Sequence, residues 1–268
     1  MVASTRFKRA HDRAVSARPY VDRLADLVGD LLAKCGKGVL CHPLLIEHHE
    51  TKADVLLVLT SNSGMCGGYN STVLSVAVKR LAQLAREGLA ARIWVTGRRG
   101  TQYLRFRKYH VERALTEFGH SPTYSQVVQV ANELMGEFLA GRIGGLEVAY
   151  TQFLSSGRQT PVIAQLLPLT YTPPPPTVPG LYQAPYEFHP SDQEILDKLL
   201  PATMRLRLYS CILDAAAAEQ IARARAMRAA TENADEMLHE LKIRYNRTRQ
   251  AQITTELAEI MGGSEEMG

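Results

Sequence analysis

Apolar and small side chains recur every three or four residues in the first part of the chain, from Phe7 to Leu31. This spacing is that of a coiled-coil seam, so we expect an N-terminal helix, which Gly36 and Gly38 would end. Pro19 falls inside this helix and should kink it or remove one hydrogen bond without shifting the phase of the seam. The seam consists of Phe7, Ala10, Ala14, Ala17, Val21, Leu24, Val28 and Leu31.

A second helical segment, from Ala202 to Met261, contains neither glycine nor proline. At about 1.5 Å per residue such a helix is roughly 90 Å long, which is more than a compact domain of this size can contain. Its C-terminal half has a narrow seam of mostly small residues, and Gly262-Gly263 is placed to cap it. We therefore expect the two ends of the chain to pair as a long antiparallel coiled coil. The second seam consists of Met227, Ala230, Ala234, Met237, Leu241, Arg244, Thr248, Ala251, Thr255 and Ala258.

Between these helices, short apolar runs alternate with amphipathic stretches, which is the pattern of βαβ units in a mainly parallel sheet. The predicted fold class is α/β: a doubly wound, Rossmann-like domain inserted between the two halves of a coiled coil. We expect an N-terminal helix over residues 1–35, a foot domain over 36–190 and a C-terminal helix over 191–268. The foot domain ends in a stiff connector, Tyr171 to Gly180, with the run Pro173 to Pro176.

The elements expected within the foot domain are four strands and three helices. The strands are Val55 to Thr60, Arg92 to Thr96, Val148 to Phe153 and Pro161 to Leu169. The helices are Ser71 to Glu87, Gly100 to Tyr109 and Thr123 to Ala140, and Ser121 or Thr123 is available as N-cap of the last.

Composition narrows the class of protein. A chain of 268 residues with 46% hydrophobic content can bury a sizeable core. No apolar stretch approaches the roughly 18 residues of a membrane span, and no signal-peptide pattern opens the chain, so we expect a cytoplasmic protein. A formal net charge of +4 demands neither nucleic acid nor a membrane surface as partner. The four cysteines, Cys35, Cys41, Cys66 and Cys211, show no disulfide framework.

The glycine-rich segment Ser61 to Asn70 follows an expected strand and opens a helix, which is where a doubly wound fold holds a phosphate group. Its glycine spacing differs from the dinucleotide fingerprint, and the turn after the next strand, Thr96 to Arg99, would at best bind an NADP phosphate. No Walker sequence is present. We favour a tight turn whose glycines permit positive φ and close packing, and we assign no cofactor.

Other groups with reactive side chains also have simpler interpretations. Cys66 has no sequence neighbour that would clearly lower its pKa, so we expect a small buried apolar residue rather than a nucleophile. No catalytic motif accompanies it. A set of thiol and imidazole side chains is close enough in sequence to bind zinc but lacks metal-ligand spacing, so we assign no metal. That set is Cys35, Cys41, His42, His48 and His49.

A basic cluster in the C-terminal helix indicates an acidic partner surface, because a helix of this length must contact something. The cluster consists of Lys242, Arg244, Arg247 and Arg249. Two other classes of protein remain open at this point. One is a nucleotide-dependent oxidoreductase with a helical dimerisation arm, and the other is a structural coiled-coil adaptor.

Three segments resemble the gamma subunit of F-type ATP synthases, and the similarity spans nearly the whole chain. Ser61 to Asn70 is similar to the family signature T-S-D-R-G-L-C-G-G-x-N, through Gly64, Cys66, Gly67, Gly68 and Asn70. Near the start, the similar residues are Met1-Val2-Ala3, Asp12-Arg13 and Ala17-Arg18-Pro19-Tyr20. In the C-terminal helix they are Arg223, Met227, Ala230-Thr231, Asn233-Ala234, Tyr245-Asn246, Arg249-Gln250, Ile253-Thr254, Glu256-Leu257, Ile260 and Gly262-Gly263.

The resemblance implies a non-catalytic rotor shaft that couples ion flow through the membrane ring to ATP synthesis or hydrolysis in the alpha/beta hexamer. It implies alpha, beta and epsilon subunits and the c-ring as partners, with neither nucleic acid nor a direct small-molecule substrate. It places the protein peripherally on the cytoplasmic face of a bacterial cell membrane. The residues implied to contact the beta subunit are Lys242, Arg244, Arg249, Gln250, Thr254 and Glu256.

Three departures from the family pattern change these expectations. The family usually has about twenty further residues before the Met-Val-Ala segment, or roughly 30 Å of helix, so we expect an upstream start or a truncated chain. Part of the C-terminal seam would then be unpaired. Asn62-Ser63 stands where Asp-Arg is common, so the charges of that pair are absent from this chain. The run from Pro173 to Pro176 has no counterpart to which we attach a function.

Overall fold

The computed structural model describes residues 2–34, 42–46, 48, 51, 53–116, 118, 122–170 and 192–265. The chain divides into two compact units, Met1–Ala224 and Arg225–Gly268. Three of the features expected from sequence lie outside the described residues. They are the helix-ending Gly36 and Gly38, the N-cap candidate Ser121, and the connector Tyr171 to Gly180.

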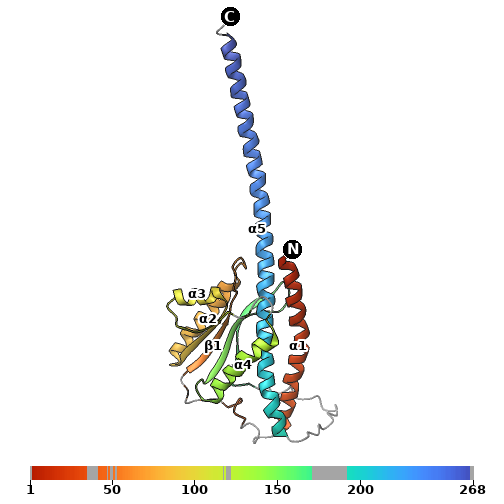
Figure 1. Ribbon diagram of the computed structural model, residues 1–268, viewed down its shortest axis with the longest axis vertical. Coiled ribbons are helices and arrows are strands. Elements are labelled where there is room, and N and C mark those ends of the chain that lie inside the picture. The colour runs from red at the N-terminus through yellow and green to blue at the C-terminus, as the bar shows by residue number, and fades with distance from the viewer. Residues whose placement is uncertain are drawn as a thin grey trace. The chain divides into compact units, whose positions relative to one another are not determined.

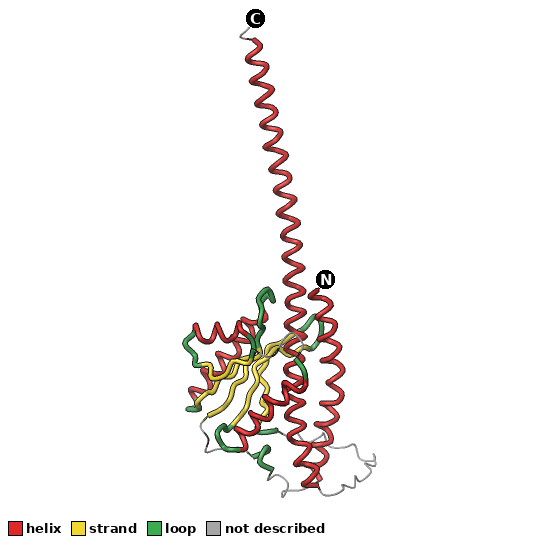
Figure 2. The backbone as a smooth tube through the Cα atoms, in the orientation of Figure 1, coloured by secondary structure: helices red, strands yellow, loops and turns green. Residues whose placement is uncertain are grey.

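Five strands form the sheet of the first unit: β1 (Ala53–Leu59), β2 (Ala90–Thr96), β3 (Val111–Leu115), β4 (Gly145–Phe153) and β5 (Gln159–Leu167). Their order is β3-β2-β1-β4-β5, and Figure 2 shows the strands side by side in yellow. The chain moves outward from β1 to β3 and then returns to the other side of β1 with β4, which is the course of a doubly wound fold. The predicted α/β fold class is confirmed. β5 differs from a purely parallel arrangement, because it pairs antiparallel with β4.

Strand β3 is the element that the sequence pattern did not predict. It has only five residues, and the polar side chains of Glu112 and Arg113 interrupt any apolar run. As the edge strand it pairs with β2 alone, so it needs no continuous apolar sequence. Its presence follows from the tertiary structure rather than from local propensity.

Five helices are described: α1 (Val2–Lys34), α2 (Tyr69–Arg86), α3 (Arg98–Phe106), α4 (Tyr124–Leu139) and α5 (Asp192–Glu265). Successive strand residues point to opposite faces of the sheet, so both faces carry a core. Leu56 and Val58 of β1 are buried with α2 and α3 on one face. Leu57 and Leu59 are buried with residues of α4 and the first part of α5 on the other face. Figure 1 shows these two helices next to the sheet.

Helix α1 packs along the first part of α5 in antiparallel orientation (Figure 1). Near the start of α1, Ala10 and Ala14 are buried against Ala217 and Ile221 of α5. The end of α1, including Leu31, instead joins the core that contains the beginning of α5. Pro19 lies inside α1, which continues through it as expected.

The two terminal helices pair as predicted, and the predicted C-terminal seam lies outside their contact. The part of α5 that contacts α1 precedes Met227, where the predicted C-terminal seam begins. Every described side chain from Arg228 to Ala258 is exposed, including those of the seam. Ala10 of α1 is buried in the same cluster as Ile221 of α5, so the contact between the two helices lies before the predicted seam.

The predicted end of α5 was also wrong. The helix continues through Gly262 and Gly263 to Glu265, so this pair does not cap it. Glycine within a helix costs about 1 kcal/mol relative to alanine, which is too little to end a helix on its own. At its other end α5 begins at Asp192, close to the expected boundary at residue 191, and it includes Pro201, which precedes the run without glycine or proline.

Helix α4 has the N-cap that the sequence offered. Thr123 and Gln126 form a capping box, in which the Thr123 N–H donates to Gln126 Oε1 at 3.0 Å. We expect Thr123→Ala to lower the free energy of unfolding by about 1 kcal/mol, because an N-terminal backbone N–H loses its acceptor. Urea unfolding measures this loss. Gln126→Glu is the control, because it keeps the acceptor; an equal loss in both variants would contradict the capping role.

Candidate functional site

The glycine-rich loop, residues 61–70, connects β1 to α2 and is held by its own side chains. Asn70 Oδ1 accepts from the Ser61 N–H at 3.0 Å, and Asn70 Nδ2 donates to Cys66 Sγ at 3.2 Å. Met65 and Gly67 adopt left-handed backbone conformations, with φ of 59° and 55°. The loop is therefore the tight turn that its glycines predicted, with a shape fixed by Asn70.

One side of the glycine-rich loop packs against α5. Cys66 and Tyr69 are buried with Ala218, and Ala222 lies against this group. Alanine on the helix side allows the loop to approach closely. Burial of Cys66 agrees with the prediction of a small apolar residue. Burial also raises the pKa of Tyr69, so its hydroxyl stays protonated and donates to the Leu59 carbonyl at 3.4 Å.

Asn62 and Ser63, which replace the common Asp-Arg pair of the signature, both have partners. Asn62 Nδ2 donates to the Phe118 carbonyl at 2.9 Å, and Asn62 Oδ1 accepts from the Arg98 N–H at 3.2 Å. Ser63 Oγ accepts a hydrogen bond from Arg223 Nη2 at 2.9 Å. Arg223 belongs to α5, so the loop has a polar contact with this helix as well as an apolar one. Sequence reasoning did not identify this contact, because 160 residues separate the two side chains.

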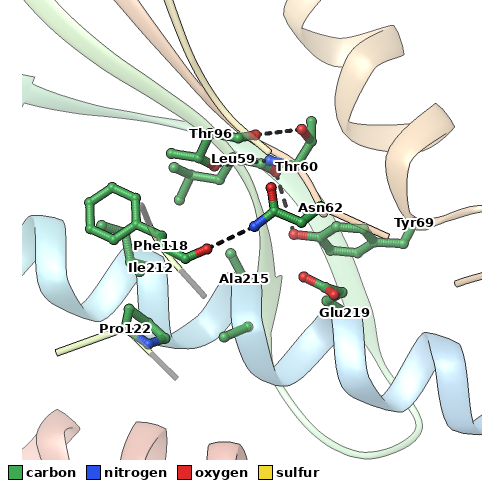
Figure 3. A pocket seen from close by; sticks show the side chains of 11 residues that line it. Leu59, Thr60, Asn62, Tyr69, Thr96, Phe118, Pro122, Ile212, Ala215 and Glu219 are labelled. Atoms are coloured by element: carbon green, nitrogen blue, oxygen red, sulfur yellow. Dashed lines mark hydrogen bonds between the residues drawn. The ribbon is translucent and has the colours of Figure 1, made fainter. Parts of the chain in front are cut away.

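A small cavity of about 40 Å³ lies at the carboxyl ends of β1 and β2 (Figure 3). In a doubly wound fold this edge of the sheet forms the ligand crevice. Here the α5 side chains of Ile212, Ala215 and Glu219 line the cavity together with Asn62 and Tyr69. Pockets that bind nucleotides or drug-sized ligands have volumes of roughly 300 Å³ or more. Helix α5 thus fills most of the position where the oxidoreductase alternative requires a dinucleotide.

Two of the histidines considered as zinc ligands lie in the described part of the chain. His42 Nε2 is 3.5 Å from Asp197 Oδ1, and burial lowers the pKa of His42 while Asp197 opposes the shift. His48 stacks edge-on against Phe138, with ring centroids 4.6 Å apart. Among the described residues, no group of three or more His, Cys, Asp or Glu side chains is arranged to hold a metal ion. Cys35, Cys41 and His49 lie outside the described residues.

The second unit consists of the C-terminal part of α5, and its described side chains are exposed from residue 228 to residue 258. We call residues 228–258 the exposed segment of α5. All of the predicted partner-contact residues lie in it: Lys242, Arg244, Arg249, Gln250, Thr254 and Glu256. Three of them, Lys242, Arg249 and Glu256, are seven residues apart and therefore lie nearly in line along the helix.

Large apolar side chains are also exposed in this segment. They are Met237, Leu238, Leu241, Ile243, Tyr245, Ile253 and Leu257, with exposures from 44% to 65%. At about 100° per residue these positions cover roughly two thirds of the helix circumference. An apolar surface of this width differs from the single seam predicted for a coiled coil, and exposed apolar patches of this kind mark binding surfaces.

A family model matches almost the whole chain, including the glycine-rich loop and the exposed segment of α5. Residues 1–267 match the ATP synthase family model. A gamma chain of ATP synthase from Rhodopirellula baltica is 38% identical over 269 residues, covering 99% of this chain and 90% of the relative. That from Frankia casuarinae is 36% identical, covering 98% and 89%. The chain belongs to the ATP synthase gamma chain family.

Solved structures agree with the gamma-family fold. A chain of the Euglena gracilis mitochondrial ATP synthase, in a structure of OSCP, F1 and c-ring, superposes with a TM-score of 0.58. It is 16% identical and covers 97% of this chain and 94% of its own length. A central-stalk chain from Tetrahymena thermophila has a TM-score of 0.55 and 16% identity, covering 86% and 100%. At 16% identity, these similarities show a shared fold and nothing further.

Proposed function

We propose that this gamma-family chain is the central rotor shaft of an F-type ATP synthase. It couples ion flow through a membrane ring to ATP synthesis or hydrolysis in a hexamer of alpha and beta subunits, and it is not itself catalytic. The observation that carries this proposal is the exposed segment of α5, whose apolar side chains cover roughly two thirds of the helix circumference. A surface of that width fits enclosure by a ring of subunits better than pairing with one partner helix.

The charged positions of the exposed segment give the proposed shaft its asymmetry. Lys242, Arg249 and Glu256 lie along one line of the helix, so rotation would present these charges to successive beta subunits. A shaft that binds three conformations of one partner differently shifts the equilibrium among them, which is how rotation becomes a change in nucleotide affinity. We assign Arg249, Gln250, Thr254 and Glu256, together with Lys242 and Arg244, to the beta-subunit contact.

Partners of the first unit follow from the same proposal. The sheet with its helices is the foot that binds the epsilon subunit and the c-ring, which makes the protein peripheral to the cytoplasmic face of a bacterial membrane. None of the helices in the described residues is long and apolar enough to span a bilayer. Residues 1–35, 36–190 and 191–268 remain the proposed functional division into N-terminal helix, foot and C-terminal helix.

ATP hydrolysis by purified alpha and beta subunits, measured with and without this chain, tests the proposal. We expect the chain to stimulate hydrolysis, because a shaft inside the ring makes successive beta subunits release product. Isothermal titration of the isolated chain with ATP and NADPH is the matched control, and we expect no micromolar binding. Absence of stimulation, or tight NADPH binding, would count against the rotor and for one of the alternative classes.

A further inference from the structure

Arg223 makes the polar contact between α5 and the glycine-rich loop. Its Nη2 atom donates to Ser63 Oγ at 2.9 Å and to Glu219 Oε1 at 2.7 Å. Only 12% of the Arg223 side chain and 13% of the Glu219 side chain are exposed. Removing one partner of an ion pair that is so shielded from water leaves an uncompensated buried charge, which is strongly destabilising. We call Ser63, Glu219 and Arg223 the clasp.

Hydrogen bonds within the glycine-rich loop hold Ser63 in place without any contribution from α5. Ser63 lies between Ser61 and Cys66, both of which contact Asn70 inside the loop. The Ser63 carbonyl also accepts from the Ser61 hydroxyl at 2.7 Å. A hydroxyl held in this way gives Arg223 a stationary acceptor.

The position of the clasp along α5 gives it a mechanical role. Arg223 lies one residue before the end of the first unit at Ala224, and the exposed segment begins at Arg228. Because α5 is one continuous helix, a torque applied to the exposed segment enters the first unit through the contacts nearest to Ala224. The apolar contacts between this part of α5 and the glycine-rich loop involve Ala218 and Ala222, whose small side chains resist rotation of the helix about its own axis only weakly. Ile221 packs in the cluster with α1 rather than with the loop.

We propose that the clasp is the torque-bearing joint between α5 and the foot, and that Arg223 is its positioning residue. This inference rests on the proposed rotor function. The buried pair of Glu219 and Arg223 sets the direction of the guanidinium, and the bond to Ser63 prevents α5 from turning against the glycine-rich loop. Without the clasp the shaft can still bind inside the alpha/beta ring, but rotation of the foot is transmitted with slip.

Ser63→Ala and Arg223→Met test the joint in the membrane-bound ATP synthase assembled with this chain. The measured quantity is the rate of ATP-driven proton pumping divided by the rate of ATP hydrolysis. We expect Ser63→Ala to lower this ratio about twofold and Arg223→Met to lower it more, because one or both hydrogen bonds of the guanidinium are lost. Ser63→Thr keeps the acceptor and should restore the ratio. Ser71→Ala, which removes a hydroxyl bonded only to the Gly68 carbonyl among the described contacts, should leave it unchanged.

Hydrogen exchange of the isolated chain gives an independent readout. In Ser63→Ala we expect the backbone amides of residues 217–223 to exchange about tenfold faster, because local opening of α5 becomes easier. If Arg223→Met does not fold, Ser63→Ala decides alone, since it keeps the buried ion pair. If a folded Ser63→Ala variant has an unchanged ratio of pumping to hydrolysis and unchanged exchange rates, the proposal that the clasp bears torque is overturned. Failure of the unmodified chain to stimulate hydrolysis would instead overturn the rotor function.

Discussion

Arg18→Met is expected to lower the free energy of unfolding at neutral pH by about 3 kcal/mol, measured by urea unfolding. Arg18 of α1 donates to the Phe153 carbonyl of β4, and its Nη2 atom is 3.1 Å from Asp214 Oδ1 of α5. The Asp214 side chain is only 7% exposed. Removing the guanidinium leaves this carboxylate buried without its cation, which costs more than the loss of a surface pair.

The same variant should show a distinct pH dependence. Burial raises the pKa of Asp214, while Arg18 opposes that shift. Because the folded pKa lies above the unfolded one, the folded state holds the proton more tightly, and stability falls as pH rises through this window. Arg18→Met removes the opposing charge, so the pKa of Asp214 rises further. The loss of stability should therefore be smaller at about pH 5 than at about pH 7.

A double-mutant cycle separates the ion pair from other effects of Arg18. Asp214→Asn removes the buried charge, so Arg18→Met should cost clearly less in that background than in the unmodified chain. Arg13→Met is the matched control, because Arg13 is an exposed arginine of the same helix. Equal losses from Arg18→Met with and without Asp214→Asn would show that the pair contributes nothing of its own.

The sequence predicted those parts of the fold that have strong local periodicity. The three-and-four spacing identified α1 and α5, and apolar runs identified β1, β2, β4 and β5, because each pattern follows from burial of one face or both. β3 was missed because an edge strand with Glu112 and Arg113 has no such pattern. The pairing of the two terminal helices was predicted, but their register was not, because seam spacing shows which face of a helix pairs and not with which residues it pairs.

In the candidate site, too, features with a local sequence pattern were predictable and contacts between distant residues were not. The glycine-rich loop was located correctly by its residues, and its role as a tight turn followed from its glycines. Its attachment to α5 through Ser63 and Arg223 was not predictable, because no local pattern relates two side chains 160 residues apart. The exposed apolar side chains were visible as residues in the sequence. The sequence did not show that these apolar side chains are exposed over roughly two thirds of the helix circumference, because exposure depends on which residues pack against the helix.

Combined replacement of Arg249 and Gln250 by alanine is expected to lower ATP hydrolysis by the assembled complex about tenfold, or about 1.4 kcal/mol of coupling to the beta subunit. Both side chains are exposed in α5, so neither stabilises the isolated chain. Arginine is frequent among residues that dominate protein interfaces, and Arg249 lies in line with Lys242 and Glu256. The double variant should therefore unfold at the same urea concentration as the unmodified chain.

Arg228→Ala provides the comparison for this last prediction, because Arg228 is an exposed arginine of α5 that we assign to no contact. A general loss of positive charge would lower activity in both variants, and the loss would shrink at high salt. A specific contact with beta-subunit loops would lower it mainly in the Arg249 and Gln250 variant. Unchanged hydrolysis in that variant would remove both residues from the proposed contact and leave the exposed apolar side chains to hold the shaft in the ring.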